Sequence, residues 1–146
     1  MKIDIKQINE GEESVIIRYR EQNPVIGRIV GILRGEGNKL WGRTDDGNVC
    51  IGLDDVLYLE SVDDKVFAYT TDRMVRIDGT LNSFMIENDE EAFFRCSKSI
   101  VINVNRVMSL KSLSSNRIDA TMEGGEHIII SRRYASEFRR FLKGER

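Results

Sequence analysis

The 146-residue sequence lacks the features that mark several protein classes. It has one proline and 12 glycines, which excludes a collagen and a low-complexity disordered chain. Its apolar runs are short, as at 128–130, whereas a membrane span needs about 20 largely apolar residues. The first six residues alternate charged and apolar side chains, which is not the pattern of a signal peptide. We therefore expect a cytoplasmic protein.

Residues that commonly carry catalysis or bind metal are also scarce. Cys50 and Cys96 lie far apart and belong to no CxxC pair, so we expect two buried thiols rather than a zinc site or a disulfide. His127 is the single histidine and is interpreted as an ordinary strand residue. The sequence contains no P-loop, GxGxxG, GxSxG or HExxH motif. Three Asp-Asp pairs are typical of turns, since successive strand residues face opposite ways. We expect no catalytic residue, metal or cofactor.

Charge is distributed unevenly along the chain. The formal net charge is −2, but residues 1–94 hold 11 basic and 19 acidic residues, a balance of −8. Residues 95–146 hold 11 basic and 5 acidic residues, a balance of +6. Such a contrast is typical of a protein with a polyanion-binding face, although solvated charges that happen to cluster explain the count equally well.

The first 44 residues form one predicted segment. Residues 2–6 and 14–20 are rich in alternating β-branched residues and predict two strands. Asn23 and Pro24 predict the start of a helix whose apolar residues recur at helical spacing up to Leu33. About 40 residues cannot bury this much apolar surface alone. The segment is therefore expected either to pair with a second protomer or to pack on its own β domain, in a dimerising or regulatory role.

Residues 45–146 predict a second domain, and the change of pattern begins near residue 39. From there the chain shows short strands with turn signals every 8–12 residues, which favours a mostly antiparallel β domain. The predicted strands are 39–43, 48–52, 56–61, 66–70, 74–77, 100–104, 107–110, 118–122 and 128–130. Thr80 and Ser131 are expected to cap two short helices, the second with Tyr134, Phe138, Phe141 and Leu142 on one apolar stripe.

Eight basic and hydroxyl-bearing residues form the candidate binding site. Basic side chains on loops suit insertion into a DNA groove, since Arg and Lys donate to guanine O6 and N7. Serine hydroxyls and the amides at a helix start can hold phosphates. Taken singly, each basic residue is explained more simply as ordinary surface charge. The candidates are Lys65, Arg95, Ser97, Lys98, Ser99, Ser131, Arg132 and Arg133.

Four stretches of the sequence, taken together, resemble LytTR-type DNA-binding domains. They are DVLYLE at 55–60, GTL at 79–81, FFRCSKSIVIN at 93–103 and ISRRY at 130–134, and the resemblance covers about residues 45–143. It implies an elongated antiparallel all-β domain with short helices, of bacterial origin. It also implies binding of double-stranded DNA through loops, at repeated promoter sites and as a homodimer at least on DNA.

The resemblance also assigns roles to individual residues. Arg133, with Arg132 beside it, matches an arginine that reads a major groove, and Lys98 matches the contact in the minor groove between two major grooves. Lys65 is the best match to the first contacting loop. Arg95 and Asn103 match the family too, but each is equally compatible with a structural role, Asn103 through bonds to the backbone at a strand end.

The predicted function is that of a transcription regulator without catalytic activity. The segment before residue 45 is too short for the receiver domain of many LytTR response regulators, so the chain resembles stand-alone members. The resemblance implies a small membrane protein as a regulatory partner. The alternative is a non-catalytic protein-interaction or sensory module of the same fold, controlled by that membrane partner, because the acidic residues of 1–94 would repel DNA.

Overall fold

The computed structural model describes residues 1–34, 39–88 and 92–144. The chain divides into two compact units, unit 1 at Met1–Gly37 and unit 2 at Asn38–Arg146, and each is described by itself. The predicted functional division into 1–44 and 45–146 stays a prediction, although residues 39–44 form a strand of unit 2. Among the described residues, no helix combines the length and the apolar character needed to cross a membrane.

Unit 1 contains one helix, α1 (Pro24–Leu33), which begins where the sequence predicts. The Asn23 side chain accepts a hydrogen bond from the Ile26 amide at 3.0 Å, and Pro24 occupies the first helical position. Both features stabilise a helix start, because the first amides have no partner within the helix. Ile26 is the buried residue of this helix.

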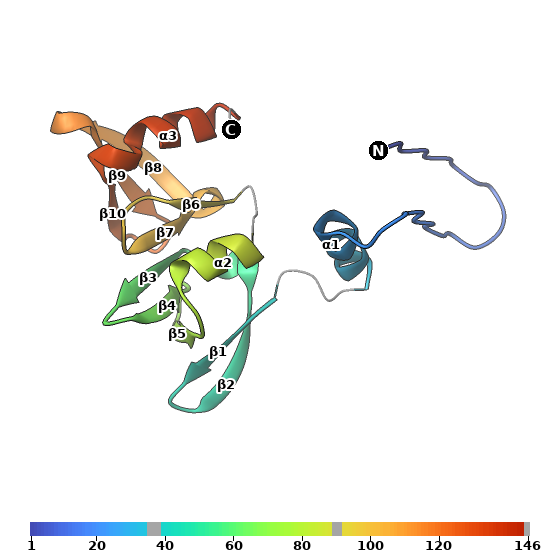
Figure 1. Ribbon diagram of the computed structural model, residues 1–146, viewed down its shortest axis with the longest axis horizontal. Helices are drawn as coiled ribbons and strands as arrows, with labels where there is room; N and C mark the ends of the chain where they lie inside the picture. Colours follow the sequence, from blue (N-terminus) through green and yellow to red (C-terminus); the bar gives the residue numbers. More distant parts are fainter. Residues whose placement is uncertain (35–38, 89–91, 145–146) are drawn as a thin grey trace. The chain divides into compact units, whose positions relative to one another are not determined.

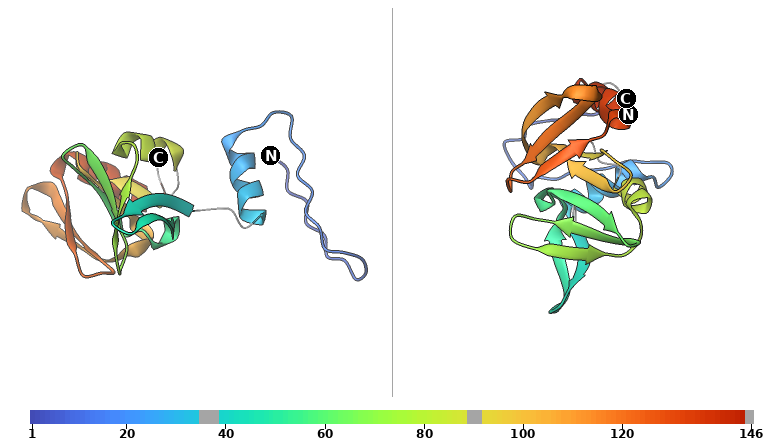
Figure 2. Two further views of the ribbon diagram at one scale, coloured as in Figure 1. Left: turned by 90° about the horizontal axis from the view of Figure 1, so that it is seen from below. Right: turned by 90° about the vertical axis from the view of Figure 1, so that its left-hand side faces the viewer.

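The two strands predicted in unit 1 are wrong. No strand is assigned anywhere in residues 1–23, and Figures 1 and 2 draw this stretch as an extended trace that turns back on itself. β-Branched residues favour an extended backbone, but a strand also needs a neighbour for its ladder of hydrogen bonds. An isolated two-stranded hairpin is marginal in water, so propensity alone does not produce strands here.

Unit 2 contains two antiparallel sheets, as the sequence predicts (Figure 1). The larger has the order β2-β1-β5-β4-β3-β7-β6 and the smaller β10-β9-β8. The strands are β1 (Lys39–Thr44), β2 (Gly47–Gly52), β3 (Tyr58–Val62), β4 (Lys65–Tyr69), β5 (Met74–Ile77), β6 (Phe93–Arg95), β7 (Ile100–Asn103), β8 (Val107–Leu113), β9 (Arg117–Met122) and β10 (His127–Ile130). The mostly β fold is confirmed, and β6 is the strand that the sequence pattern missed.

Two hydrophobic cores lie on opposite faces of β6 and β7. Phe93 and Val101 belong to the first core, which fills the inner face of the large sheet. Phe94 and Ile102, the next residues along each strand, belong to the second core, which the small sheet covers. Because successive strand residues face opposite ways, these two strands are buried on both faces and join the two halves of the unit.

The β1–β2 hairpin approaches its neighbour closely through a glycine. A Cβ atom built on Gly42 would lie 2.1 Å from Cγ1 of Val75 on β5, so only glycine fits where the hairpin crosses β5. On the other face of the hairpin, Trp41 opposes Cys50 and is 67% exposed. Cys50 is only half-buried, contrary to the expectation of two buried thiols, whereas Cys96 is fully buried.

Two helices complete unit 2. The shorter is α2 (Leu81–Glu87), capped as predicted: Thr80 Oγ1 accepts from the Ser83 amide at 3.0 Å, and Ser83 Oγ accepts from the Thr80 amide at 2.9 Å. The longer is α3 (Arg132–Leu142), which packs Phe138 into the second core.

The predicted start and apolar stripe of α3 need two corrections. Ser131 occupies the N-cap position, but its side chain makes no capping hydrogen bond. Tyr134 and Phe141 pack against the second core as expected. Leu142 does not, because it is 47% exposed at the last turn of the helix, and Ala135 is buried in its place.

Candidate nucleic-acid interface

Three turns that carry the candidate residues lie next to one another in unit 2. They are the β3–β4 turn, the β6–β7 turn and the β10–α3 junction. The amide of Ser61, near the end of β3, donates to the carbonyl of Ser99 at 2.8 Å, which links the strand that leads into the first turn to the second turn. The Ser131 amide donates to the carbonyl of Cys96 at 3.0 Å, which joins the second to the third. We call these three turns together the basic end of unit 2.

The β3–β4 turn is a two-residue hairpin turn at Asp63 and Asp64. Their φ values are 51° and 62°, the left-handed conformation that such tight turns require and that Asp tolerates better than most residues. Lys65 follows as the first residue of β4 and is exposed. The turn thus presents one ammonium next to two carboxylates, which makes it the least cationic of the three.

The β6–β7 turn is held from inside by Arg95. Its Nε donates to the carbonyl of Ser97 at 3.1 Å and one Nη donates to the carbonyl of Lys98 at 2.5 Å, while the other Nη binds Asn82 of α2. These donors are therefore occupied within the protein. Arg95 positions the turn, while the Lys98 side chain at its tip is exposed.

The two serines of this turn differ from Lys98 in exposure. Ser97 and Ser99 are half-buried, and Ser97 Oγ accepts a hydrogen bond from the Ser99 amide at 3.3 Å. Cys96 beside them is fully buried, and burial raises the pKa of its thiol to about 12. The cysteine is therefore a neutral core residue, and the turn has a fixed backbone on which Lys98 projects.

The β10–α3 junction presents two adjacent arginines. Arg132 and Arg133 are both exposed, and the Arg133 guanidinium lies 5.5 Å from the centre of the Tyr134 ring. The Ser131 and Ala135 positions fix the helix start, since the Ala135 amide donates to the Ser131 carbonyl at 3.0 Å. The first amides of a helix have no intrahelical acceptor and attract anions.

The four exposed cations of the basic end share one property. Within the described residues, none of Lys65, Lys98, Arg132 and Arg133 forms an ion pair with a carboxylate. Their charge is therefore available to a phosphate backbone without the loss of an existing pair.

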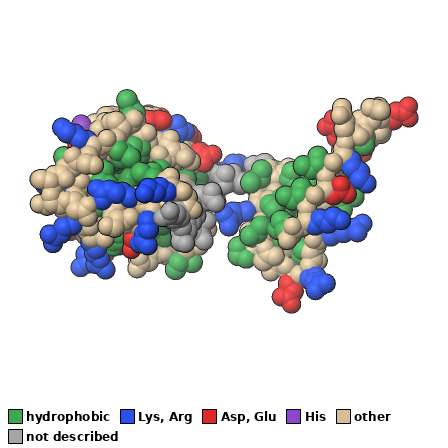
Figure 3. All heavy atoms as spheres, turned by 90° about the horizontal axis from the view of Figure 1, so that it is seen from above, with side chains coloured by type: hydrophobic (Ala, Val, Ile, Leu, Met, Phe, Trp, Pro, Cys, Tyr) green, Lys and Arg blue, Asp and Glu red, His purple; other side chains and the backbone are tan. Residues whose placement is uncertain are grey.

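Two further cations, one in α3 and one at its C-cap, extend this surface, and the sequence pattern did not identify them. Arg140 is seven residues after Arg133 and so lies on the same side of the helix, and Lys143 follows it; both are exposed. Figure 3 looks down on the side of unit 2 where α3 lies and shows several Lys and Arg side chains gathered there. Helical spacing from Arg133 would have identified Arg140. Arg139, by contrast, donates to the Asn116 side chain at 2.6 Å.

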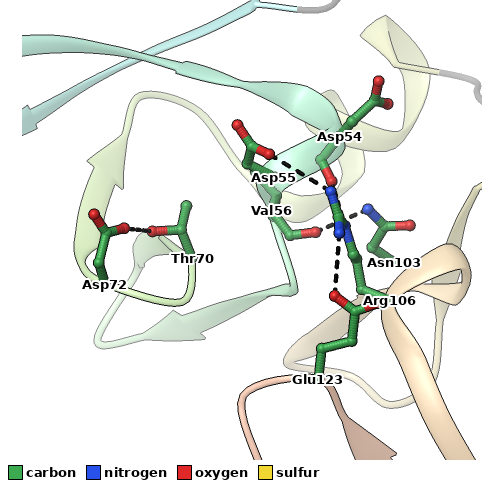
Figure 4. A network of polar contacts seen from close by, with 8 residues as sticks. All are labelled: Asp54, Asp55, Val56, Thr70, Asp72, Asn103, Arg106 and Glu123. Carbon is green, nitrogen blue, oxygen red and sulfur yellow. Dashed lines mark hydrogen bonds and ion pairs between the residues drawn. The ribbon is translucent and has the colours of Figure 1, made fainter.

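At the far ends of the same strands lies a different set of charges, shown in Figure 4. Arg106 donates through Nε to the Asp54 carbonyl at 2.8 Å, and its guanidinium lies 3.5 Å from an Asp55 oxygen and 3.1 Å from a Glu123 oxygen. Asp55 precedes β3, Arg106 follows β7 and Glu123 precedes β10, whereas the basic turns occupy the other ends of these strands. We call this region the Arg106 end.

Asn103 at the end of β7 has the structural role that the sequence allowed for it. Its Nδ2 donates to the Val56 carbonyl at 2.8 Å, and its Oδ1 accepts from the Asn105 amide at 3.1 Å. The side chain is 2% exposed, so both hydrogen bonds replace bonds to water that burial removes.

A hollow of about 460 Å³ lies at the Arg106 end and is lined by Asp55, Arg73, Arg106 and Glu123 among others.

His127 has a local partner and no wider cluster. It begins β10, is exposed, and its Nδ1 lies 3.0 Å from a carboxylate oxygen of Asp119 on the paired strand β9. In the described parts of the chain, no three His, Cys, Asp or Glu side chains are grouped so that they could hold a metal ion.

Comparison with known proteins identifies the family of unit 2. The family model described as the LytTr DNA-binding domain matches residues 46–143. The chain belongs to the LytTR DNA-binding domain family. A solved LytTr DNA-binding domain from Bacillus cereus superimposes with a TM-score of 0.69 and 27% identity, covering 72% of this chain and 96% of that one.

Curated relatives are longer than this chain. The sensory transduction proteins LytT of Bacillus anthracis and Bacillus cereus are each 24% identical over 108 residues, which is 74% of this chain and 44% of each relative. A LytT of Enterococcus faecalis is 25% identical over 87 residues. The chain therefore spans less than half the length of the curated relatives that it matches. The family supports DNA-binding transcription regulation, and unit 1 lies outside the matched region.

Proposed function

We propose that this protein is a transcription regulator that binds double-stranded DNA in a sequence-specific manner through the basic end of unit 2. The observation that carries the proposal is a set of four exposed cations that have no carboxylate partner among the described residues, on three neighbouring turns held together by backbone hydrogen bonds. Rigid turns that project cations at fixed spacing can reach base edges, while nearby serines and helix amides hold the phosphates. Membership of the family supports the same function.

Each of the three turns receives a separate role in this proposal. Arg133 reads guanine in a major groove, with Arg132 on the adjacent phosphates, because a guanidinium fits O6 and N7 in a bidentate manner. Lys98 samples the minor groove next to it, with Ser97, Ser99 and Ser131 near the backbone. Lys65 approaches the second major groove, where Asp63 and Asp64 limit how closely the turn can come. Arg95 acts on DNA only through the turn that it holds.

The wider setting follows from the same proposal. The protein acts in the cytoplasm, without catalysis, metal or cofactor, and it binds promoter repeats as a homodimer. A small membrane protein regulates it. The hollow at the Arg106 end favours one alternative, a protein-interaction module of the same fold, because its lining of both charge signs offers partners for a polar peptide.

A mobility-shift assay at about 0.15 M salt tests DNA binding, with duplexes from the DNA upstream of the gene and from a broad promoter library. The expected result is a shifted complex on a small subset of duplexes, and a much weaker shift on scrambled versions of them. If no duplex in the library is shifted more strongly than its scrambled control, sequence-specific binding is wrong. Capture of a protein partner by the same preparation would then favour the interaction module.

A further inference from the structure

Unit 1 exposes far more apolar surface than its size predicts. Ten of the 18 large apolar side chains that are exposed in the described residues lie in residues 1–33, less than a quarter of the chain. They are Met1, Ile3, Ile5, Ile8, Val15, Ile16, Tyr19, Val25, Ile32 and Leu33. Exposed apolar surface at this density marks a place where another surface binds.

Helix α1 also exposes apolar side chains to solvent. Its sequence is PVIGRIVGIL, in which Arg28 is the single charged residue. Apolar residues therefore lie on nearly every side, yet Ile32 is 60% exposed and Leu33 54% exposed. A helix that is apolar all round is normally buried, so a 10-residue helix of this composition needs a partner surface.

The charges before α1 indicate which surface that is. Residues 12–20 read EESVIIRYR, so two carboxylates begin the segment, three apolar residues occupy its middle and two guanidiniums end it. Turned antiparallel about a two-fold axis at Ile16, the segment opposes its own copy with the Glu12 carboxylate facing the Arg20 guanidinium at both ends. In the described chain, none of Glu12, Glu13, Arg18 and Arg20 forms an ion pair.

We propose that unit 1 is a dimerisation element in which residues 12–20 of two copies pair as antiparallel strands about a two-fold axis. With Ile16 on the axis, Glu12 of each copy opposes Arg20 of the other and lies diagonally from Arg18, while Val15 opposes Ile17. An isologous contact of this kind is self-complementary, as a two-fold axis requires. It also supplies the hydrogen-bonding neighbour that residues 14–20 lack in one chain.

This inference locates the homodimer proposed above and uses none of the DNA-contacting residues. The test is sedimentation of the full-length protein in the micromolar range, with two charge-reversal variants. Arg18→Glu/Arg20→Glu makes the segment acidic throughout, and Glu12→Arg/Glu13→Arg makes it basic throughout. Each variant alone is expected to dimerise at least about tenfold more weakly, since opposed like charges destabilise paired strands. An equal mixture of the two is expected to form heterodimers at least as tight as the original dimer.

A matched control separates pairing from net charge. Lys2→Glu/Lys6→Glu changes the charge by the same amount as the acidic variant but lies outside residues 12–20, and it is expected to leave dimerisation unchanged. The proposal is overturned if the unaltered protein is monomeric, if the control weakens the dimer as much as the acidic variant, or if the mixture stays monomeric. Binding of each variant to one duplex half-site is measured in parallel, so loss of the dimer is distinguished from loss of DNA binding.

Discussion

The two ends of unit 2 contain similar residues in opposite electrostatic situations. At the Arg106 end, the guanidinium is satisfied by a backbone carbonyl and two carboxylates. At the basic end, Arg132, Arg133 and Lys98 are exposed and have no carboxylate partner within the described residues. The same strands connect both ends, so the fold holds one set of charges in fixed pairs and presents the other to solvent.

The comparison shows which cations are available for DNA. A guanidinium that already pairs with two carboxylates would have to lose them to bind phosphate, whereas an unpaired one releases only counterions from the DNA. Arg95 is intermediate between the paired and the unpaired cations. It lies at the basic end, but its guanidinium donates hydrogen bonds to carbonyls of its own turn. A position at the basic end therefore does not by itself make a cation available to DNA. Its availability depends on the hydrogen bonds that it already makes within the protein.

The largest expected effect is that of salt on DNA binding. With four to eight phosphate contacts at about −0.9 per contact, the log–log slope of affinity against salt would be about −4 to −7. Affinity should then fall by about a hundredfold to ten-thousandfold between 50 and 200 mM salt. Fluorescence anisotropy with one labelled duplex measures this slope. A nearly flat response would mean that the unpaired cations do not meet phosphates.

The second effect is the loss of Arg133, the arginine that we propose reads a base. Arg133→Ala should reduce affinity for the cognate duplex by about tenfold to a hundredfold, because a bidentate contact to guanine contributes about 1–3 kcal/mol of discrimination. Affinity for scrambled DNA should fall much less. Anisotropy at one fixed salt concentration gives both values, and circular dichroism checks that the variant folds.

Arg73→Ala is the matched control for this substitution. It removes the same charge from the turn between β4 and β5, which lines the hollow at the Arg106 end. Its affinity for both duplexes should stay within about twofold of the original, since long-range effects of one exposed charge are screened at physiological salt. Equal losses on cognate and scrambled duplexes for Arg133→Ala would reduce Arg133 to a phosphate contact, and no loss would remove it from the interface.

A smaller effect is expected at the tip of the middle turn. Lys98→Ala should reduce cognate affinity by less than about tenfold, because the minor groove offers only a degenerate pattern of acceptors. Its effect on scrambled DNA should be nearly as large, which distinguishes it from Arg133→Ala. The measurement is the same pair of binding curves at one salt concentration. A loss confined to the cognate duplex would instead assign a base-specific contact to Lys98.

Much of unit 2 could be predicted from the sequence because its determinants are local. Turn residues and alternating apolar residues predict nine of its strands, and Thr80 predicts the start of α2 through a capping box that needs only neighbouring residues. The basic turns were found because their residues match a known family in order and spacing. Strand β6 was missed because three residues give too short a pattern to detect.

The rest depends on contacts between distant residues, which a sequence pattern does not contain. Residues 14–20 have the composition of a strand, but the chain gives them no neighbour. Arg95 and Lys98 are three residues apart and both match the family, and the sequence left open a structural role for Arg95. Only the fold shows that Arg95 turns inward onto carbonyls and Asn82. Arg106 likewise meets Asp55 and Glu123 only after three strands have been placed.

Apart from the Arg73→Ala control, the smallest expected effect on DNA affinity is at Arg106, where the comparison between the two ends is sharpest. Arg106→Ala should leave cognate affinity within about threefold, because the residue lies at the far ends of β3, β7 and β10 from the basic turns. The substitution should lower the free energy of unfolding by about 1–2 kcal/mol, since a charge-assisted hydrogen bond and two partly exposed ion pairs are lost. Urea unfolding measures this, with Arg73→Ala as a control that removes the same charge without these contacts. A tenfold loss of DNA affinity with unchanged stability would show instead that both ends act in DNA binding.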